Sequence, residues 1–357
     1  MNNQKMQNWI VKSKPIFVGL EDSKKTWKLS VRSEQMEVHY TSMPAEYSNL
    51  YNYLSNRYPD CEVTVIYEAG FHGFWLHDLL EADGIRCVVT PPTRVTGERR
   101  RRIKNDKIDA RRLGVVLETG DYKRCFVPDR EQREDRQISR TLIAVQKDIT
   151  RNCSRIKMML HYHGIKHGLV DGEWSEKQYR SLRHLEGLGD SFRYSLYIML
   201  DILEMLFDRA KELKRKLKDL SRKPRYARAF DRLSSVVGIG ELTAIRMILE
   251  WGVDWSRFGS SKKVSRFSGL IASEASTGDR DHKGRITGES AGFVRSWLIQ
   301  SAWTAIRRDP VLLSKFQCVW RNSGSKKKAI VAVARKLVVR MRAVLISDVP
   351  YMIGVVE

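Results

Sequence analysis

The first 92 residues alternate short β-type runs with helical patterns, and this alternation limits the possible folds more than any other feature of the chain. Four runs rich in β-branched and aromatic residues occupy 16–22, 27–32, 61–70 and 85–90. Helical patterns follow the second run at 45–57 and the third at 73–82, and Pro91 and Pro92 close the last run. Such alternation predicts an α/β sheet covered by helices.

Most of the remaining chain has helical patterns. One covers 133–163, glycines and polar residues interrupt the pattern at 164–189, and a second helix runs over 192–222. Apolar residues of this second helix recur near a 3.5-residue period: Leu196, Leu200, Leu203, Phe207, Ala210 and Leu217. The stripe fits either a coiled coil between subunits or a hairpin with the preceding helix of the same chain.

The chain is long enough for more than one domain, because 357 residues exceed what one hydrophobic core usually fills. We expect an α/β domain over 14–130, a helical connector over 131–225 and a mostly helical domain over 226–350. Glycine and serine predict loops in the last domain, including one at 273–285, and the domain ends in a basic helix.

The charge balance indicates a polyanionic partner. Lysine and arginine number 64 against 42 acidic residues, for a net charge of +22, and nucleic acid is the polyphosphate that such a surface attracts. A basic ribosome-associated protein is the alternative. The sequence has no apolar run of about 18 residues and no signal-peptide pattern, so we expect no membrane and a cytoplasmic location. Five scattered cysteines without a CxxC spacing predict neither zinc nor disulfides.

Four acidic residues stand where an α/β fold places its ligands. Glu21 and Glu68 each end a β-type run, and Asp106 and Asp109 lie three residues apart in the first turn of an expected helix. Singly, each also fits a solvated turn or a helix start. Together they form a set of oxygen ligands suited to Mg²⁺ and phosphoryl transfer.

Two further segments have functional interpretations. Residues 233–249 read as helix, tight GIG turn, helix, which is typical either of a helix-hairpin-helix that contacts a DNA backbone or of a plain helical hairpin. Ser276 and Thr277 lie in the polar loop expected at 273–285. Hydroxyls in such loops are usually turn formers, and either one is a candidate nucleophile for a phosphodiester.

The order of these motifs resembles one family. It is similar to insertion-sequence transposases that pair a RuvC-like DEDD domain with a serine-bearing transposase domain, a group that includes Piv-type invertases and bridge-RNA-guided recombinases. The similarity extends over 16–351. The segments that carry it are IFVGLEDSKKTW, VIYEAGFHGFWLHDLLEADGIRCVVTPP, KNDKIDARRLG, VVGIGELTA, FSGLIASEASTG and the final basic helix.

The resemblance implies an RNase H-like (RuvC-like) α/β domain, a coiled-coil connector and a mostly α transposase domain with a helix-hairpin-helix-like element. It also implies strand exchange between donor and target DNA through a covalent serine–DNA intermediate, a structured guide RNA, and a homo-oligomer, dimeric or tetrameric. Carried over by position, the acids that hold Mg²⁺ are Glu21, Glu68, Asp106 and Asp109, and Ser276 is the nucleophile.

The sequence departs from the family pattern at several positions. Glu21 stands where aspartate is usual, Ala272 where proline is usual, and residues 288–292 read GESAG instead of a basic turn. Alignment on Gly278 alone favours Thr277 as nucleophile, whereas the S-[ST]-G pattern favours Ser276. Two other functions remain open: a metal-dependent DNA junction nuclease, and a catalytically weakened nucleic-acid-binding relative.

Overall fold

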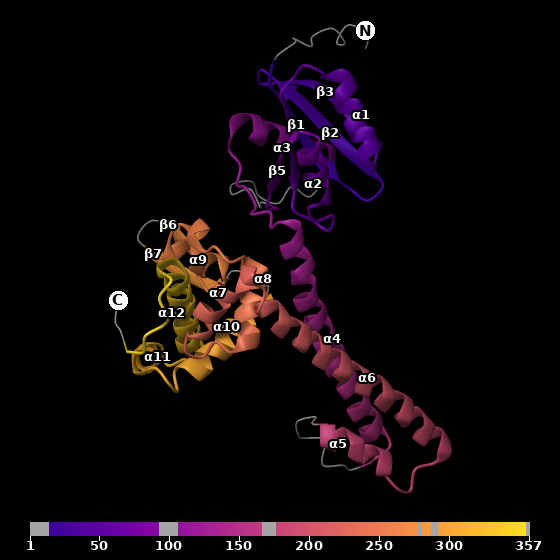
Figure 1. Ribbon diagram of the computed structural model, residues 1–357, viewed down its shortest axis with the longest axis vertical. Helices are drawn as coiled ribbons and strands as arrows, with labels where there is room; N and C mark the ends of the chain where they lie inside the picture. The colour runs from indigo at the N-terminus through magenta and orange to yellow at the C-terminus, as the bar shows by residue number, and fades with distance from the viewer. Residues whose placement is uncertain (1–13, 93–105, 166–175, 278–279, 287–291, 355–357) are drawn as a thin grey trace. The chain divides into compact units, whose positions relative to one another are not determined.

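The computed structural model describes residues 14–92, 106–165, 176–277, 280–286 and 292–354, and the chain divides into two compact units (Figure 1). The N-terminal unit is Met1–Val127 and the C-terminal unit is Pro128–Glu357. The N-terminal unit is α/β and the C-terminal unit is mostly helical, as expected. The division into three domains stays a prediction. No helix among the described residues is long and apolar enough to cross a membrane.

A mixed five-stranded sheet forms the centre of the N-terminal unit, in the order β3-β2-β1-β4-β5. Strands β1, β2 and β3 are antiparallel neighbours, and β4 and β5 continue the sheet parallel to β1. Four strands match the predicted runs. The bounds are β1 Ile16–Asp22, β2 Thr26–Ser33, β3 Met36–Pro44, β4 Val63–Glu68 and β5 Arg86–Thr90.

Helices cover both faces of this sheet. On one face, α1 (Tyr47–Arg57) and α2 (Trp75–Ala82) pack on Ile16, Val18 and Leu20 of β1. On the other face, α3 (Asp106–Thr119) places Leu113 and Leu117 in a cluster with Phe17, Ile66 and Val88. Because successive strand residues face opposite sides, even-numbered positions of β1 face α1 and α2, and odd-numbered positions face α3.

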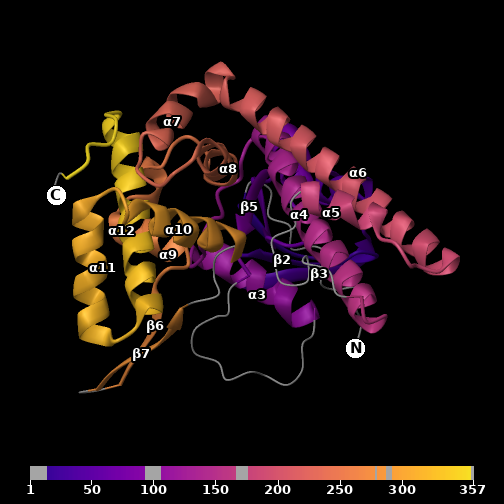
Figure 2. The same ribbon diagram turned by 90° about the horizontal axis from the view of Figure 1, so that it is seen from below.

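Two long helices open the C-terminal unit and lie side by side (Figures 1 and 2). They are α4 (Arg130–Tyr162) and α6 (Asp190–Ser221), with the short α5 (Glu176–Ser181) and a 3₁₀ turn at Leu182–His184 between them. The predicted stripe is buried within the chain, since Leu196, Leu200 and Leu203 pack with Ile156 and Leu160 of α4. The intrachain hairpin is therefore the arrangement that buries these leucines.

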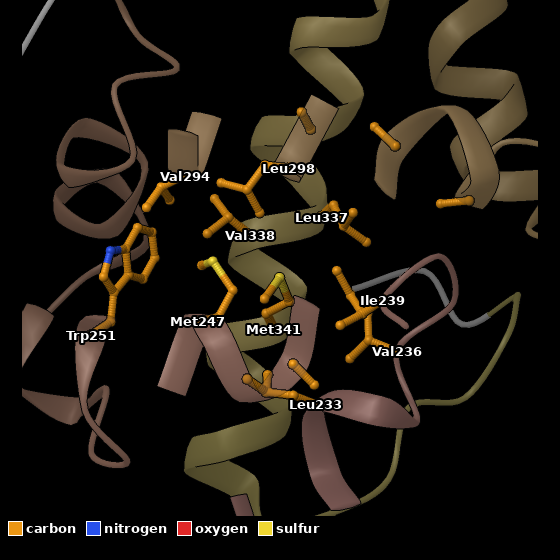
Figure 3. Close-up of a cluster of buried hydrophobic side chains, with 14 of the residues drawn as sticks. Leu233, Val236, Ile239, Met247, Trp251, Val294, Leu298, Leu337, Val338 and Met341 are labelled. Carbon is orange, nitrogen blue, oxygen red and sulfur yellow. The ribbon is translucent and has the colours of Figure 1, made fainter. Parts of the chain in front are cut away.

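The rest of the C-terminal unit is a helical bundle around one hydrophobic core. Its elements are α7 (Pro224–Ser234), α8 (Glu241–Trp251), a 3₁₀ turn (Ser256–Phe258), α9 (Ser261–Phe267), β6 (Ala272–Thr277), β7 (Arg280–Ile286), α10 (Gly292–Ala305), α11 (Pro310–Ser323) and α12 (Lys326–Ser347). Figure 3 shows Met247 of α8 and Leu298 of α10 beside Val338 of α12, and Leu337 of α12 beside Ile239. The final basic helix thus has one side in the core.

One local prediction is wrong. The segment 273–285 was expected to be a loop, but it pairs as an antiparallel hairpin of β6 with β7. Its polar and glycine-rich composition hides the strands because the hairpin has no wide apolar face to bury. The residues at its tip, 278–279, lie outside the described part of the chain.

Candidate catalytic site

Strand register brings Glu21 and Glu68 together. Leu20 of β1 pairs with Tyr67 of the parallel strand β4, so the next residue on each strand is the glutamate. Both glutamates lie at the carboxyl ends of adjacent parallel strands, and both are partly exposed. By strand alternation they share the face of the sheet that α3 covers. Ligands of open α/β sheets bind at this kind of edge.

The first turn of α3 lies at the same end of the sheet. Near its C-terminal end, α3 carries Glu118, which bonds Arg32, and Arg32 is the β2 partner of Phe17 early in β1. At the middle of α3, Ala110 lies against Gly19, further along β1. The helix therefore runs antiparallel to β1, and Asp106 and Asp109 begin it at the end where Glu21 lies.

Close contact fixes the height of α3 above the sheet. A Cβ on Gly19 would overlap the carbonyl oxygen of Ala110 and the backbone of Gly114. Glycine at this position therefore lets the helix backbone lie directly on β1. Asp109 is one turn before the buried Leu113, so helical periodicity puts it toward the sheet side of the helix.

The described side chains by themselves do not complete a metal site. Among the described residues, no group of three or more Asp, Glu, His or Cys side chains is arranged to hold a metal ion. The side chain of Asp106 lies outside that description. The backbone thus brings Glu21, Glu68 and the first turn of α3 to one edge, and the four-ligand set stays a prediction.

A polar clamp from the antiparallel strands holds the start of α3, and sequence reasoning missed it. Arg111 donates two hydrogen bonds to Glu37 of β3, of 2.9 and 2.7 Å, and Ser30 donates another to Glu37 at 2.8 Å. Lys107 and Arg111 both lie over the ring of Tyr40. Burial alone would raise the pKa of Glu37, but the Arg111 and Ser30 hydrogen bonds lower it below its ordinary value.

Asp22 has a different partner from its neighbour Glu21. Its carboxylate lies 3.0 Å from Nδ1 of His72, in the segment between β4 and α2. Burial raises the pKa of Asp22 above its ordinary value, although the nearby His72 opposes that shift. Strand alternation places Asp22 on the opposite face of the sheet from Glu21, and its bond to His72 agrees with that placement.

The candidate nucleophiles lie in the other unit. Ser276 and Thr277 are the last two residues of β6, and their backbones pair with Asp281 and Arg280 of β7. Their side chains lie outside the described part of the structure. The hairpin leaves both residues beside its tip, next to Gly278.

The GIG turn between α7 and α8 has a clear packing role. Gly238 has φ +88°, and a Cβ there would overlap the carbonyl oxygen of Ser301 in α10. Val236 and Ile239, on either side of it, are buried in the core shown in Figure 3. Packing therefore accounts for Gly238. Gly240, in open space at the start of α8, is the glycine that can approach a DNA backbone.

Comparisons with known proteins agree with this architecture. Residues 18–164 match the DEDD model of IS110-type transposases, and residues 230–317 match the model of the transposase IS116/IS110/IS902 family. The acids Glu21, Glu68, Asp106 and Asp109 all fall inside the first match. Ser276 and Thr277 fall inside the second match.

Relatives extend the match to most of the chain. The "Putative transposase y4rJ" of Sinorhizobium fredii is 30% identical over 364 residues, which covers 91% of this chain and 90% of that protein. The "Transposase for insertion sequence element IS1533" of Leptospira borgpetersenii is 23% identical over 209 residues, 58% of this chain and 60% of that protein.

An α/β domain of the DEDD type followed by a helical transposase domain defines the class of DNA transposases to which such relatives belong. The chain belongs to the IS116/IS110/IS902 transposase family. It is accordingly an enzyme that transfers DNA strands. Its DEDD domain implies dependence on a divalent metal ion.

Proposed function

We propose that this transposase exchanges strands between donor and target DNA through a covalent link to Ser276, with Mg²⁺ held by Glu21, Glu68, Asp106 and Asp109. The N-terminal unit would then be an RNase H-like, RuvC-like domain. One observation carries the proposal: the register of β1 and β4 sets Glu21 beside Glu68 at the edge where α3 begins.

The donor chemistry at this edge fits a hard divalent cation. Carboxylates are the oxygen ligands that Mg²⁺ prefers, and carboxylates brought close together repel each other unless a cation neutralises them. When bound, the ion would stabilise the charge that develops on the phosphate oxygens. The Glu37–Arg111 pair would keep Asp106 and Asp109 at the edge before the ion binds.

The covalent step is a balanced exchange of bonds. The Ser276 hydroxyl loses its proton and bonds phosphorus, while the bond from phosphorus to the leaving deoxyribose oxygen breaks and that oxygen takes up a proton. Attack by a hydroxyl of a second DNA strand then releases the serine. A phosphoseryl link conserves the bond energy that strand exchange requires and hydrolysis would lose.

The charge of +22 supports nucleic acid as the partner, and the resemblance supports a structured guide RNA beside the two DNA segments. A cytoplasmic location is also part of the proposal. A homo-oligomer, dimeric or tetrameric, is part of the same proposal. Helix α6 offers an exposed apolar stripe at spacings of four, four and three residues, away from its buried leucines. The stripe consists of Tyr194, Ile198, Ile202 and Met205.

Trapping of protein on DNA tests the proposal. With a labelled DNA substrate and Mg²⁺, the wild-type chain should leave protein–DNA adducts that survive denaturant. Ser276→Ala should abolish them and leave DNA binding unchanged, and Thr277→Ala should only weaken them. Cleavage without any adduct would favour a metal-dependent junction nuclease. Undiminished adducts from the double variant would overturn the serine mechanism.

A further inference from the structure

Two partly exposed tryptophans of the C-terminal unit are linked through a third aromatic ring. Trp303 of α10 and Trp320 of α11 are 39% and 40% exposed. The buried Phe316 lies between them, with ring centroids 5.6 Å from Trp303 and 6.0 Å from Trp320. We call Trp303, Trp320 and the neighbouring Lys326 the tryptophan face.

The helices that carry the tryptophan face are rich in cationic residues. Between residues 292 and 347 the sequence has twelve lysines and arginines and a single acidic residue, Asp309. The Asp309 side chain is fully buried and accepts a hydrogen bond from Arg340 at 2.8 Å. The exposed charges of α10, α11 and α12 are therefore all positive, and the surface is complementary to a polyanion.

Lys326 joins the rings to this charge. Its ammonium lies 4.8 Å from the centroid of the Trp320 ring, at the start of α12, just after the Gly324–Ser325 turn from α11. Lys327 and Lys328 follow in the same helical turn, where the helix dipole disfavours cations. The helix dipole therefore gives these three lysines no stabilising role in α12, and an anion from outside the chain would be a favourable partner for them.

We propose that the tryptophan face binds unpaired DNA, with nucleobases stacked on Trp320 and Trp303 and the phosphates near Lys326–Lys328. Exposed flat rings within a positive surface are the general means of holding single strands, because every base has a face that stacks. In a duplex the bases stay stacked on each other, so a duplex can interact with the lysines through its phosphates but cannot stack its bases on the tryptophans. Strand transfer opens duplex DNA, so this enzyme meets unpaired bases during its own reaction.

The inference deepens the nucleic-acid part of the proposed function but requires neither Ser276 nor a metal ion. Binding is therefore measured without divalent metal, on the full-length protein, by fluorescence anisotropy of a labelled oligothymidylate of about 12 nucleotides. A duplex and an oligoribonucleotide of the same length form the other arms. A failure here leaves the adduct experiment on Ser276 untouched, and the reverse also holds.

Trp320→Leu should weaken single-strand binding about tenfold, and Trp320→Phe should weaken it less than about threefold, because phenylalanine still offers a ring. Duplex binding should change less than about twofold. The matched control is Trp75→Leu, since Trp75 is also 40% exposed but lies on α2, which has Asp78 and Glu81 and no lysine or arginine. That control should bind all three probes as the wild type does.

Lys326→Gln removes the charge and its contact with the Trp320 ring but leaves both tryptophans in the chain, and its exposed position keeps folding intact. The slope of log K against log[salt] should become shallower by about one unit with the single strand. Wild-type single-strand affinity in both Trp320→Leu and Lys326→Gln would overturn the proposal. If the variants lose affinity for the duplex as much as for the single strand, bases do not stack on the tryptophans. If they lose affinity for the oligoribonucleotide alone, the tryptophan face binds RNA and not DNA.

Discussion

Two regions differ in how the surrounding structure supports them. The acid edge is the end of the N-terminal sheet with Glu21 and Glu68, and the hydroxyl hairpin is the β6–β7 hairpin of the C-terminal unit with Ser276 and Thr277. Glu21 belongs to a strand paired on both sides, in a sheet with helices on both faces. Ser276 belongs to a two-stranded sheet, and within the described part of the chain β6 and β7 pair only with each other. Isolated two-stranded hairpins are marginally stable in water.

On the proposed function, this difference corresponds to two chemical tasks. Ligands that share a metal ion must be held in place, because a displacement of about 1 Å can cost a large part of the rate. If Ser276 is the nucleophile, its hydroxyl must approach the phosphorus in line with the leaving oxygen, and a weakly supported hairpin allows that movement. We therefore expect substitutions that loosen the acid edge to be costly even where they touch no acid.

The largest expected effect comes from the acids themselves. Glu68→Gln and Asp109→Asn keep the shape of the side chain and remove its charge, so each should lower strand exchange by at least about 100-fold. DNA affinity, measured by anisotropy, should stay within about twofold. Glu46→Gln is the control, because Glu46 is exposed and caps α1 without a side-chain hydrogen bond. Full strand exchange by both acid variants would refute the assignment of a metal site to this edge of the sheet.

A second prediction concerns the contact between α3 and β1. Gly19→Ala forces its methyl group into the backbone of Ala110 and Gly114, so α3 must move. We expect a loss of about 3 kcal/mol in the free energy of unfolding in urea, with a matching loss of strand exchange. Gly114→Ala meets mainly the flexible Arg32 side chain, 2.9 Å from its Cδ, and should cost about 1 kcal/mol. Equal stability of the two variants would contradict the close contact.

The sequence could predict those candidate site residues whose positions follow from a local pattern of secondary structure. Glu21 and Glu68 end runs of β-branched residues, and the regular period of two sets their face once the strands are known. Strand β3 escaped prediction because its side chains are mostly half-buried at the sheet edge, and its polar residues interrupt any apolar alternation. The Glu37–Arg111 pair joins residues 74 positions apart, so tertiary packing alone brings the two together.

A third, smaller effect concerns the clamp. Glu37→Gln should slow strand exchange about tenfold without changing DNA affinity, because α3 keeps its place less well. The folded pKa of Glu37 is lowered, so its stabilisation is present above the ordinary value of 4.5 and is lost as the pH falls through the folded pKa. Urea unfolding should thus separate variant and wild type by about 1 kcal/mol at pH 7, and less as the pH falls below 4.

The control for the clamp is Arg32→Lys. Arg32 bonds Glu118 near the C-terminal end of α3 and is also the register partner of Glu37, so lysine removes the guanidinium contact but keeps the positive charge beside Glu37. Arg32→Lys should lower stability by a similar amount, because lysine cannot reproduce the planar guanidinium contact. It should leave the exchange rate nearly unchanged, since the far end of α3 does not carry the acids. If both variants slow exchange equally, the clamp acts through stability alone.

The smallest effect is expected from Glu21→Asp, which restores the aspartate that the family resemblance implies at this position. If Glu21 is a ligand, its extra methylene displaces the carboxylate by about 1 Å, and the strands on both sides prevent the backbone from compensating. Glu21→Asp should then preserve the exchange rate or raise it up to about tenfold, while Glu21→Gln should fall with Glu68→Gln. A rate for Glu21→Asp as low as that of Glu21→Gln would mean that the longer side chain is required and that the edge has adapted to it. Wild-type activity in Glu21→Gln would mean that three acids suffice, because a ligand cannot lose its charge without affecting the ion.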